Sequence, residues 1–196
     1  PIGAGVTTGA ANYEHGSEVV IIANPNIGWK FNNWVENEQI ISNDSLYVFA
    51  ITNNRTFTAN FNKKVYSIST SSSPSEGGVT YGDSSYTHGD NVTLRAIPNF
   101  IIGYKFNNWT ENGNLVSSNT TFSFTAISNR NLVANFELKN YDVTLFTNPN
   151  DGGIVSGSGK FTHGDSVSIV ASPNTGWLFA NWTENGLNIS DTTNYT

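Results

Sequence analysis

The sequence predicts an all-β protein built from a small module that repeats in tandem about every 73 residues. Three features of the sequence predict this class: short runs of alternating apolar and polar residues, turn residues between the runs, and motifs that recur three times. An alternation with a period of two is typical of strands with one buried face. No window keeps a helical period, and the abundant Asn, Thr and Val lower helix propensity along the chain.

Two motifs mark the repeat. The first is an aromatic residue two positions before His-Gly, and its histidines are His15, His88 and His163. The second is Asn-Trp-x-Glu-Asn, and its tryptophans are Trp34, Trp109 and Trp182. The steps between histidines are 73 and 75 residues, whereas the steps between tryptophans are 75 and 73. The middle repeat therefore carries a two-residue insertion, which lies between Pro98 and Gly103.

These alignments divide the chain into three repeats. We expect residues 1–65 to form a first repeat that lacks its first strand. Residues 66–140 form a complete second repeat with the insertion, and residues 141–196 form a third that lacks its last strands. Pro1 aligns with Pro74 and Pro149. We therefore expect a piece of a longer tandem array; the alternative is a permuted unit whose ends are completed by neighbouring molecules.

The strands of the complete repeat can be placed in order from its apolar alternation. We expect about six strands, separated by turns at residues 77–78, 88–90, 98–99, 111–113 and 128–129. Apolar residues that alternate along the expected strands are Val92, Leu94 and Ala96, then Phe122 and Phe124, then Leu132, Ala134 and Phe136. Asn112-Gly113 is the strongest hairpin signal, and Asn185-Gly186 repeats it in the third unit.

The composition excludes several classes of protein. Only 12% of the residues are charged and 13% are aromatic, which argues against intrinsic disorder. With nine basic residues and a net charge of −6, the chain cannot build the basic surface that nucleic acids require. It has no cysteine, which excludes disulfides and thiol catalysis, and no apolar run long enough to span a membrane.

Two sets of aromatic residues are candidates for a core or a contact surface. Each recurrent Trp follows a Phe by three positions, as in Phe31 and Trp34, so a bulge is needed to bring both rings into the core. We interpret these pairs as core anchors. The better candidates for an exposed platform that contacts sugar rings are Trp29, Tyr104 and Trp177, although packing is the first interpretation for these as well.

The recurrent polar residues indicate no enzyme, cofactor or metal site. Each repeat has one His, which we interpret as a turn residue before a Gly with positive φ. Each has one recurrent Glu, namely Glu36, Glu111 and Glu184, but no second acid at a fixed offset that could complete a catalytic pair. We therefore expect a non-enzymatic protein.

The insertion of the middle repeat places Phe100, Ile101 and Ile102 at the tip of a turn. Three apolar residues are unfavourable on a solvated surface, so we expect them to pack onto a neighbouring repeat. The alternative is a contact site for a partner or for another copy of the chain.

The combined motifs resemble the divergent internalin-type B-repeat family, also called Listeria–Bacteroides repeats. The resemblance rests on the Pro-x-x-Gly-Gly segment at 74–78, the His-Gly-Asp motif at 88–90, the Pro-Asn turn at 98–99, Asn-Trp-Thr-Glu-Asn at 108–112 and Ala-Asn-Phe at 134–136. It implies a small β-grasp-like module strung in tandem within secreted or cell-surface bacterial proteins. It also implies a stalk or adhesion role, with no catalytic residue to carry over.

Three hypotheses of function follow. The first is a structural stalk or spacer of an extracellular or cell-wall protein, whose partners are the neighbouring repeats. The second is a module that binds a surface glycan or protein through exposed aromatic residues. The third is a self-assembling extracellular filament subunit that pairs with other copies of itself through strand edges. None of them involves nucleic acid or membrane insertion of this segment.

Overall fold

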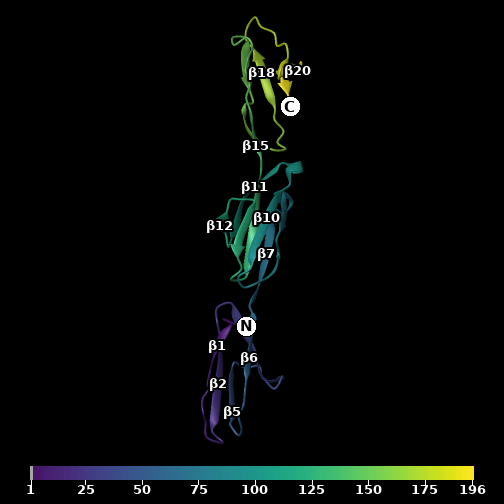
Figure 1. Ribbon diagram of the computed structural model, residues 1–196. Helices are drawn as coiled ribbons and strands as arrows, with labels where there is room; N and C mark the ends of the chain where they lie inside the picture. Colours follow the sequence, from purple (N-terminus) through teal and green to yellow (C-terminus); the bar gives the residue numbers. More distant parts are fainter. Residues whose placement is uncertain (1) are drawn as a thin grey trace. The chain divides into compact units, whose positions relative to one another are not determined.

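The computed structural model describes residues 2–196 (Figure 1). Pro1, at the start of the expected first repeat, lies outside the described residues. The described part contains strands, turns and two short 3₁₀ segments, Ser75–Gly77 and Phe100–Ile102, and it has no α-helix. The chain divides into two compact units. One holds the chain up to Ser71 with Thr80–Arg95 and Trp109–Val133, and the other holds Ser72–Val79, Ala96–Asn108 and Ala134–Thr196.

The first repeat, which lies in the first unit, is built from two three-stranded antiparallel sheets. The order of the first sheet is β1 (Gly5–Thr8), β2 (Glu18–Pro25) and β5 (Leu46–Ala50). The order of the second is β4 (Gln39–Ser42), β3 (Trp29–Glu36) and β6 (Thr58–Lys63). The alternation of β2 buries Val19, Ile21 and Ala23, so one face of this strand supplies half of the core.

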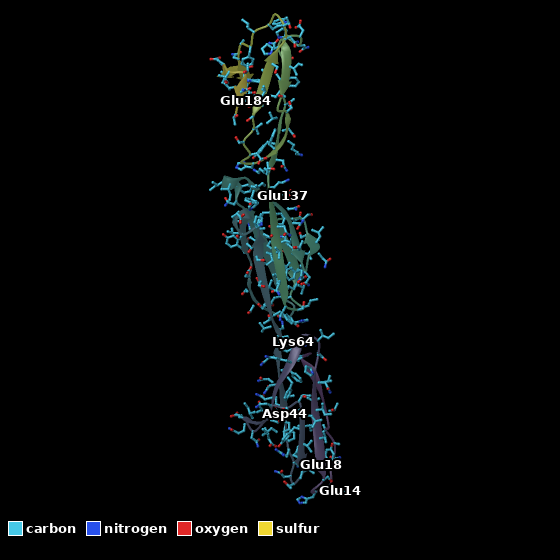
Figure 2. The ribbon with its side chains drawn as sticks, turned by 180° about the vertical axis from the view of Figure 1, so that it is seen from behind. Glu14, Glu18, Asp44, Lys64, Glu137 and Glu184 are labelled. Atoms are coloured by element: carbon cyan, nitrogen blue, oxygen red, sulfur yellow. The ribbon has the colours of Figure 1, made fainter. Side chains whose placement is uncertain are left out.

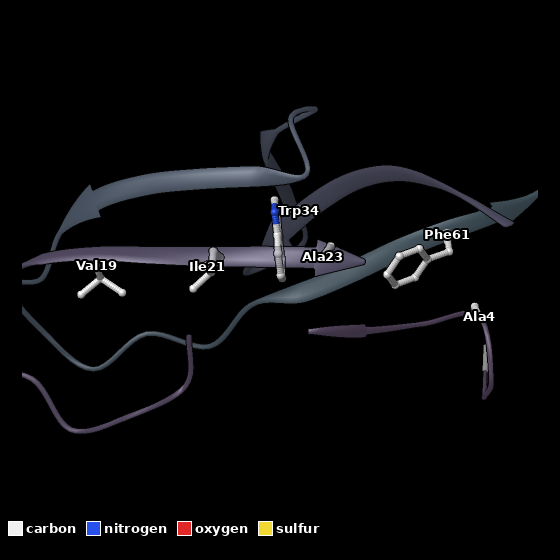
Figure 3. Close-up of a cluster of buried hydrophobic side chains, with 6 residues drawn as sticks. All are labelled: Ala4, Val19, Ile21, Ala23, Trp34 and Phe61. Carbon is white, nitrogen blue, oxygen red and sulfur yellow. The ribbon is translucent and has the colours of Figure 1, made fainter. Parts of the chain in front are cut away.

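Residues from both sheets meet in the core of the first repeat (Figure 3). The buried residues are Ala4, Val19, Ile21, Ala23, Trp34 and Phe61. Half-buried aromatic residues such as Phe31, Tyr47 and Phe57 pack around them. A core this small depends on large side chains, since each aromatic ring removes more apolar surface from water than an aliphatic residue does.

The middle repeat contains a three-stranded and a five-stranded sheet. The order of the first is β13 (Thr121–Thr125), β10 (Asn91–Pro98) and β8 (Gly78–Tyr81). The order of the second is β12 (Asn114–Ser117), β11 (Tyr104–Glu111), β14 (Arg130–Leu138), β7 (Val65–Ser73) and β9 (Ser84–Thr87). Hydrogen bonds from Ser67 to Asn129 and from Ser69 to Asn131 have the same sequence separation, so β7 and β14 run parallel at the centre of the sheet.

The third repeat, which lies in the second unit, contains three small antiparallel sheets. They pair β15 (Asn140–Val143) with β17 (Gly159–Thr162), and β19 (Trp182–Glu184) with β20 (Leu187–Ser190). The other sheet has the order β16 (Gly153–Ser156), β18 (Ile169–Pro173) and β21 (Asn194–Tyr195). The buried apolar residues of the third repeat are Ile169 and Trp182.

The recurrent Trp makes the same contacts in every repeat. Trp34, Trp109 and Trp182 are 2%, 0% and 7% exposed. Each indole N–H donates to a backbone carbonyl 11 residues further on, at 3.3, 3.4 and 3.4 Å, and the acceptors are Ser45, Thr120 and Thr193. The ring therefore fills the core while its one polar atom is satisfied by the chain that approaches the next strand.

The structure confirms the local predictions that depend on turns and bulges. A register shift between Phe31 and Asn33 brings the Phe31 ring within 5.7 Å of Trp34, as the spacing of three requires. Asn112 and Gly113 both have positive φ (50° and 79°) and join β11 to β12 as a hairpin. The alternating residues of β10 and β14 are buried. The all-β class and the tandem arrangement are therefore confirmed.

Two leucines of the middle repeat test whether burial on β10 stabilises it. Leu94 is fully buried, whereas Leu115 on β12 is 66% exposed. We expect Leu94→Ala to lower the free energy of unfolding by about 2–5 kcal/mol, because it removes core contacts and leaves a cavity. Leu115→Ala should change it by less than about 0.5 kcal/mol. Native-state hydrogen exchange of the β10 amides measures both, and similar losses from the two variants would contradict this account of the core.

Candidate functional site

The two places where one repeat passes into the next are built in the same way. One residue, Lys64, separates the last strand of the first repeat, β6, from the first strand of the second, β7 (Figure 2). Lys139 likewise stands alone between β14 and β15. Linkers of one residue leave the chain little freedom at the passage between repeats.

Both backbone polar groups of each linker residue are hydrogen-bonded. The N–H of Lys64 donates to the carbonyl of Gly28 in the preceding repeat at 2.8 Å, and its carbonyl accepts from the N–H of His88 in the following repeat at 2.8 Å. At the second passage the N–H of Lys139 donates to Gly103 at 2.9 Å, and its carbonyl accepts from His163 at 2.8 Å. Each linker is therefore fixed from both sides in the same way.

The expected aromatic platform residues differ in their surroundings. Trp29 is half-buried and packs against the core of the first repeat. Tyr104 is also half-buried, and its hydroxyl donates to Oε1 of Glu76 at 3.3 Å. Trp177 is 42% exposed. A contact role for these three residues stays a prediction.

The inserted residues of the middle repeat form a short 3₁₀ segment, Phe100–Ile102. Phe100, Ile101 and Ile102 are 62%, 92% and 42% exposed. The ammonium of Lys139 lies 5.4 Å from the centre of the Phe100 ring. Packing of this tip onto a neighbouring repeat, or onto a partner, stays a prediction.

Two of the recurrent Glu residues, Glu36 and Glu111, are held in ion pairs. Glu36 accepts hydrogen bonds from both nitrogens of the Arg55 fork, with 2.9 Å between Nε and Oε1. Glu111 is bound in the same way by Arg130, with 2.7 Å between Nη2 and Oε2. The guanidinium groups also lie over aromatic rings, Arg55 at 4.6 Å from Phe49 and Arg130 at 4.2 Å from Phe124. The ion pairs thus connect the end of β3 to the segment before β6, and the end of β11 to the start of β14.

Each turn histidine is followed by a glycine that turns the chain. Gly16, Gly89 and Gly164, which follow them, have positive φ as expected. Asp90 and Asp165 accept from the backbone N–H groups of Thr87 and Thr162, at 2.8 and 2.7 Å, and so close the turn. Within residues 2–196 no three His, Cys, Asp or Glu side chains gather as a metal site would require. No helix in this part of the chain is long and apolar enough to cross a membrane.

Two grooves correspond to places that strands fill in the complete repeat. One groove of about 530 Å³ lies in the first repeat and is lined in part by Tyr13. The matching Tyr86 pairs with Tyr66 of β7. The other, of about 360 Å³, is lined in part by Gly152 and Gly153, whose counterparts Gly77 and Gly78 lie against the ring of Phe136 on β14. Both grooves therefore lie where the complete repeat has strands.

Two functional contacts were missed by reasoning from the sequence. One is the Glu–Arg pair, which a Glu followed by Arg 19 residues later in two repeats could have indicated. The other is the contact of the turn His with the preceding repeat. No pattern within a single repeat could have indicated this contact, because its two partners lie in different repeats.

A family model for the divergent InlB B-repeat domain matches residues 1–65, 68–140 and 143–196. The chain belongs to this family. Comparison with curated proteins and with solved structures gave no match. The B-repeat is a structural repeat and not a known enzyme family, and it is typical of bacterial surface proteins. The three matched segments make this chain a tandem array of B-repeats.

The Glu36–Arg55 pair predicts how the stability of the first B-repeat depends on pH. Hydrogen bonds from Arg55 hold the pKa of Glu36 below its ordinary value of 4.5, and the charge of Arg55 adds to this effect while desolvation opposes it. A lowered folded-state pKa means that the pair stabilises the repeat above pH 4.5 and that this contribution is lost as the pH falls through the folded-state value.

We therefore expect Glu36→Gln to be less stable than the parent at neutral pH and to lose less stability on acidification below pH 4.5. Urea unfolding at a series of pH values, monitored by hydrogen exchange of the β3 amides, measures the difference in stability between the variant and the parent. Glu14→Gln, at an exposed site, is the matched control. A Glu36→Gln variant with the same pH slope as the parent would be inconsistent with a stabilising pair.

Proposed function

We propose that this chain is a non-enzymatic spacer within an extracellular or cell-surface bacterial protein, where it holds an adhesive or other binding part away from the cell wall. The observation that carries the proposal is the linker of one residue with both backbone groups hydrogen-bonded, which occurs twice. A spacer needs each module to be stable and each joint to resist bending, and this arrangement serves the second need.

The rest of the molecule is consistent with such a role. The recurrent polar residues are used in turns and ion pairs, and the grooves correspond to strand positions. The surface carries few charges and a net charge of −6, which favours solubility without a basic patch. The partners of each repeat are then its neighbours in the array.

Light scattering combined with small-angle X-ray scattering over a wide range of protein concentration tests the proposal. We expect the mass of a single chain at every concentration, and dimensions that do not change with concentration. A mass that grows with protein concentration would contradict the spacer and favour the self-assembling filament subunit.

A glycan array probed with the same protein tests the remaining alternative, binding through the exposed Trp177. Here we expect no binding. Binding that Trp177→Ala abolishes and that Leu178→Ala, at a neighbouring site 93% exposed, preserves would make the chain a glycan-binding module instead.

A further inference from the structure

The side chain of the turn histidine lies on the preceding repeat. A Cβ atom built on Gly28 would lie 2.1 Å from Cδ2 of His88, and one built on Gly103 would lie 2.1 Å from Cγ of His163. The two imidazole rings therefore pack directly against the glycines. The side chain of any other residue at these two positions would overlap the ring. The same glycines provide the carbonyls that accept from Lys64 and Lys139.

The ring is held from its own side by the first strand of its repeat. The hydroxyl of Tyr66 lies 3.3 Å from Nδ1 of His88, and the hydroxyl of Tyr141 lies 3.4 Å from Nδ1 of His163. The ring centres are 5.9 and 6.0 Å apart. Each Tyr is the second residue of its strand and lies two residues after the linker Lys, so the linker, the Tyr and the His lie together.

The glycines and histidines that meet at a contact between repeats are more buried than their counterparts in the other repeats. Gly28 and Gly103 are buried, whereas Gly176, at the same place in the third repeat, is exposed and has no atom within 4 Å of a Cβ position. His88 and His163 are half-buried, whereas His15 is exposed. The three glycines have the same backbone conformation, with φ of 81°, 81° and 87°. The conformation of the turn therefore belongs to each repeat, and the burial comes from the contact between repeats.

We propose that the turn histidine of each repeat forms an inter-repeat joint by packing on the glycine that follows the Pro-Asn turn of the preceding repeat. The partner that this glycine accepts is another repeat of this kind, with an aromatic hydroxyl on its first strand and a His before its turn Gly. Glycine is required at this position for two independent reasons: its positive φ and the ring that covers it.

This joint explains a use of His that the turn alone does not require. Asp90 and Gly89 are sufficient to close the turn, through the bond to Thr87 and the positive φ. The imidazole adds a flat surface that covers the glycine and excludes water from the two backbone hydrogen bonds of the linker. The joint is a property of neighbouring repeats and holds whether the array serves as a spacer or in another role.

Hydrogen exchange at the amides of Lys64 and His88 measures opening of the first joint, because these two N–H groups make the hydrogen bonds that cross it. We expect His88→Ala and Gly28→Ala each to lower the protection of these amides about tenfold. The amide of Ala23, which donates to Ser45 within the first repeat, should keep its protection in His88→Ala.

The chain offers matched controls for both substitutions. Gly176→Ala imposes the same strained φ without a covering ring, and His15→Ala removes the same side chain from an exposed site. Both should leave the protection of Lys64 and His88 unchanged. Loss of protection in the controls, or full protection in both His88→Ala and Gly28→Ala, would overturn the joint.

A distance measurement gives a second readout that is independent of amide chemistry. The sequence has no cysteine, so spin labels can be attached uniquely through Asn43→Cys and Ser118→Cys, at exposed matching sites of the first two repeats. We expect one narrow distance distribution that broadens when His88→Ala is added and stays narrow with His15→Ala. An equally broad distribution in the labelled parent and in both labelled variants would refute the joint but leave a flexible spacer possible. A narrow distribution in a chain that polymerises would refute only the spacer.

Discussion

Burial of one Trp per repeat is the constraint on which the fold depends. A module of about 73 residues with few charges and no disulfide has little apolar surface to remove from water, so one indole ring supplies a large share of it. The ring also connects strands, since its N–H reaches a carbonyl 11 residues away in all three repeats. The hairpin that begins at this residue recurs in all three repeats, as β3–β4, β11–β12 and β19–β20.

The interactions within repeats and between them are of different kinds. Within a repeat the core is apolar and aromatic, with an Arg fork closing one edge. Between repeats the contacts are two backbone hydrogen bonds and an imidazole ring on a glycine. Energetically such an array approximates a sum of intrinsic repeat terms and nearest-neighbour terms, so core and joint can vary independently. A substitution at Leu94 acts on the first kind of term and one at Gly28 acts on the second.

The sequence was informative where a residue's role follows from a local pattern within its own repeat. Period-two alternation identified the buried faces of β10 and β14, the Asn-Gly pair identified the hairpin, and the spacing of Phe31 and Trp34 required the bulge that β3 contains. The Arg55 and Arg130 partners were missed because a separation of 19 residues corresponds to no local period. The contact of His88 with Gly28 was missed because single-repeat reasoning assigns both residues fully to their own turns. For the same reason the exposed tip at Phe100 stays a prediction, since its sequence says nothing about what lies beside it.

The insertion in the middle repeat shows which part of the turn the joint uses. Phe100–Ile102 lengthens the chain between Asn99 and Gly103, and yet the second joint repeats the first almost to the tenth of an ångström in its two backbone bonds. The glycine, its carbonyl, the linker Lys and the Tyr–His pair are common to both joints, whereas the tip differs in length and sequence. The tip is then free to differ among repeats, and Ile27, Ile101 and Thr175 occupy it in turn with little burial. At this tip the repeats differ in length and sequence, while the two backbone hydrogen bonds of the joint stay the same.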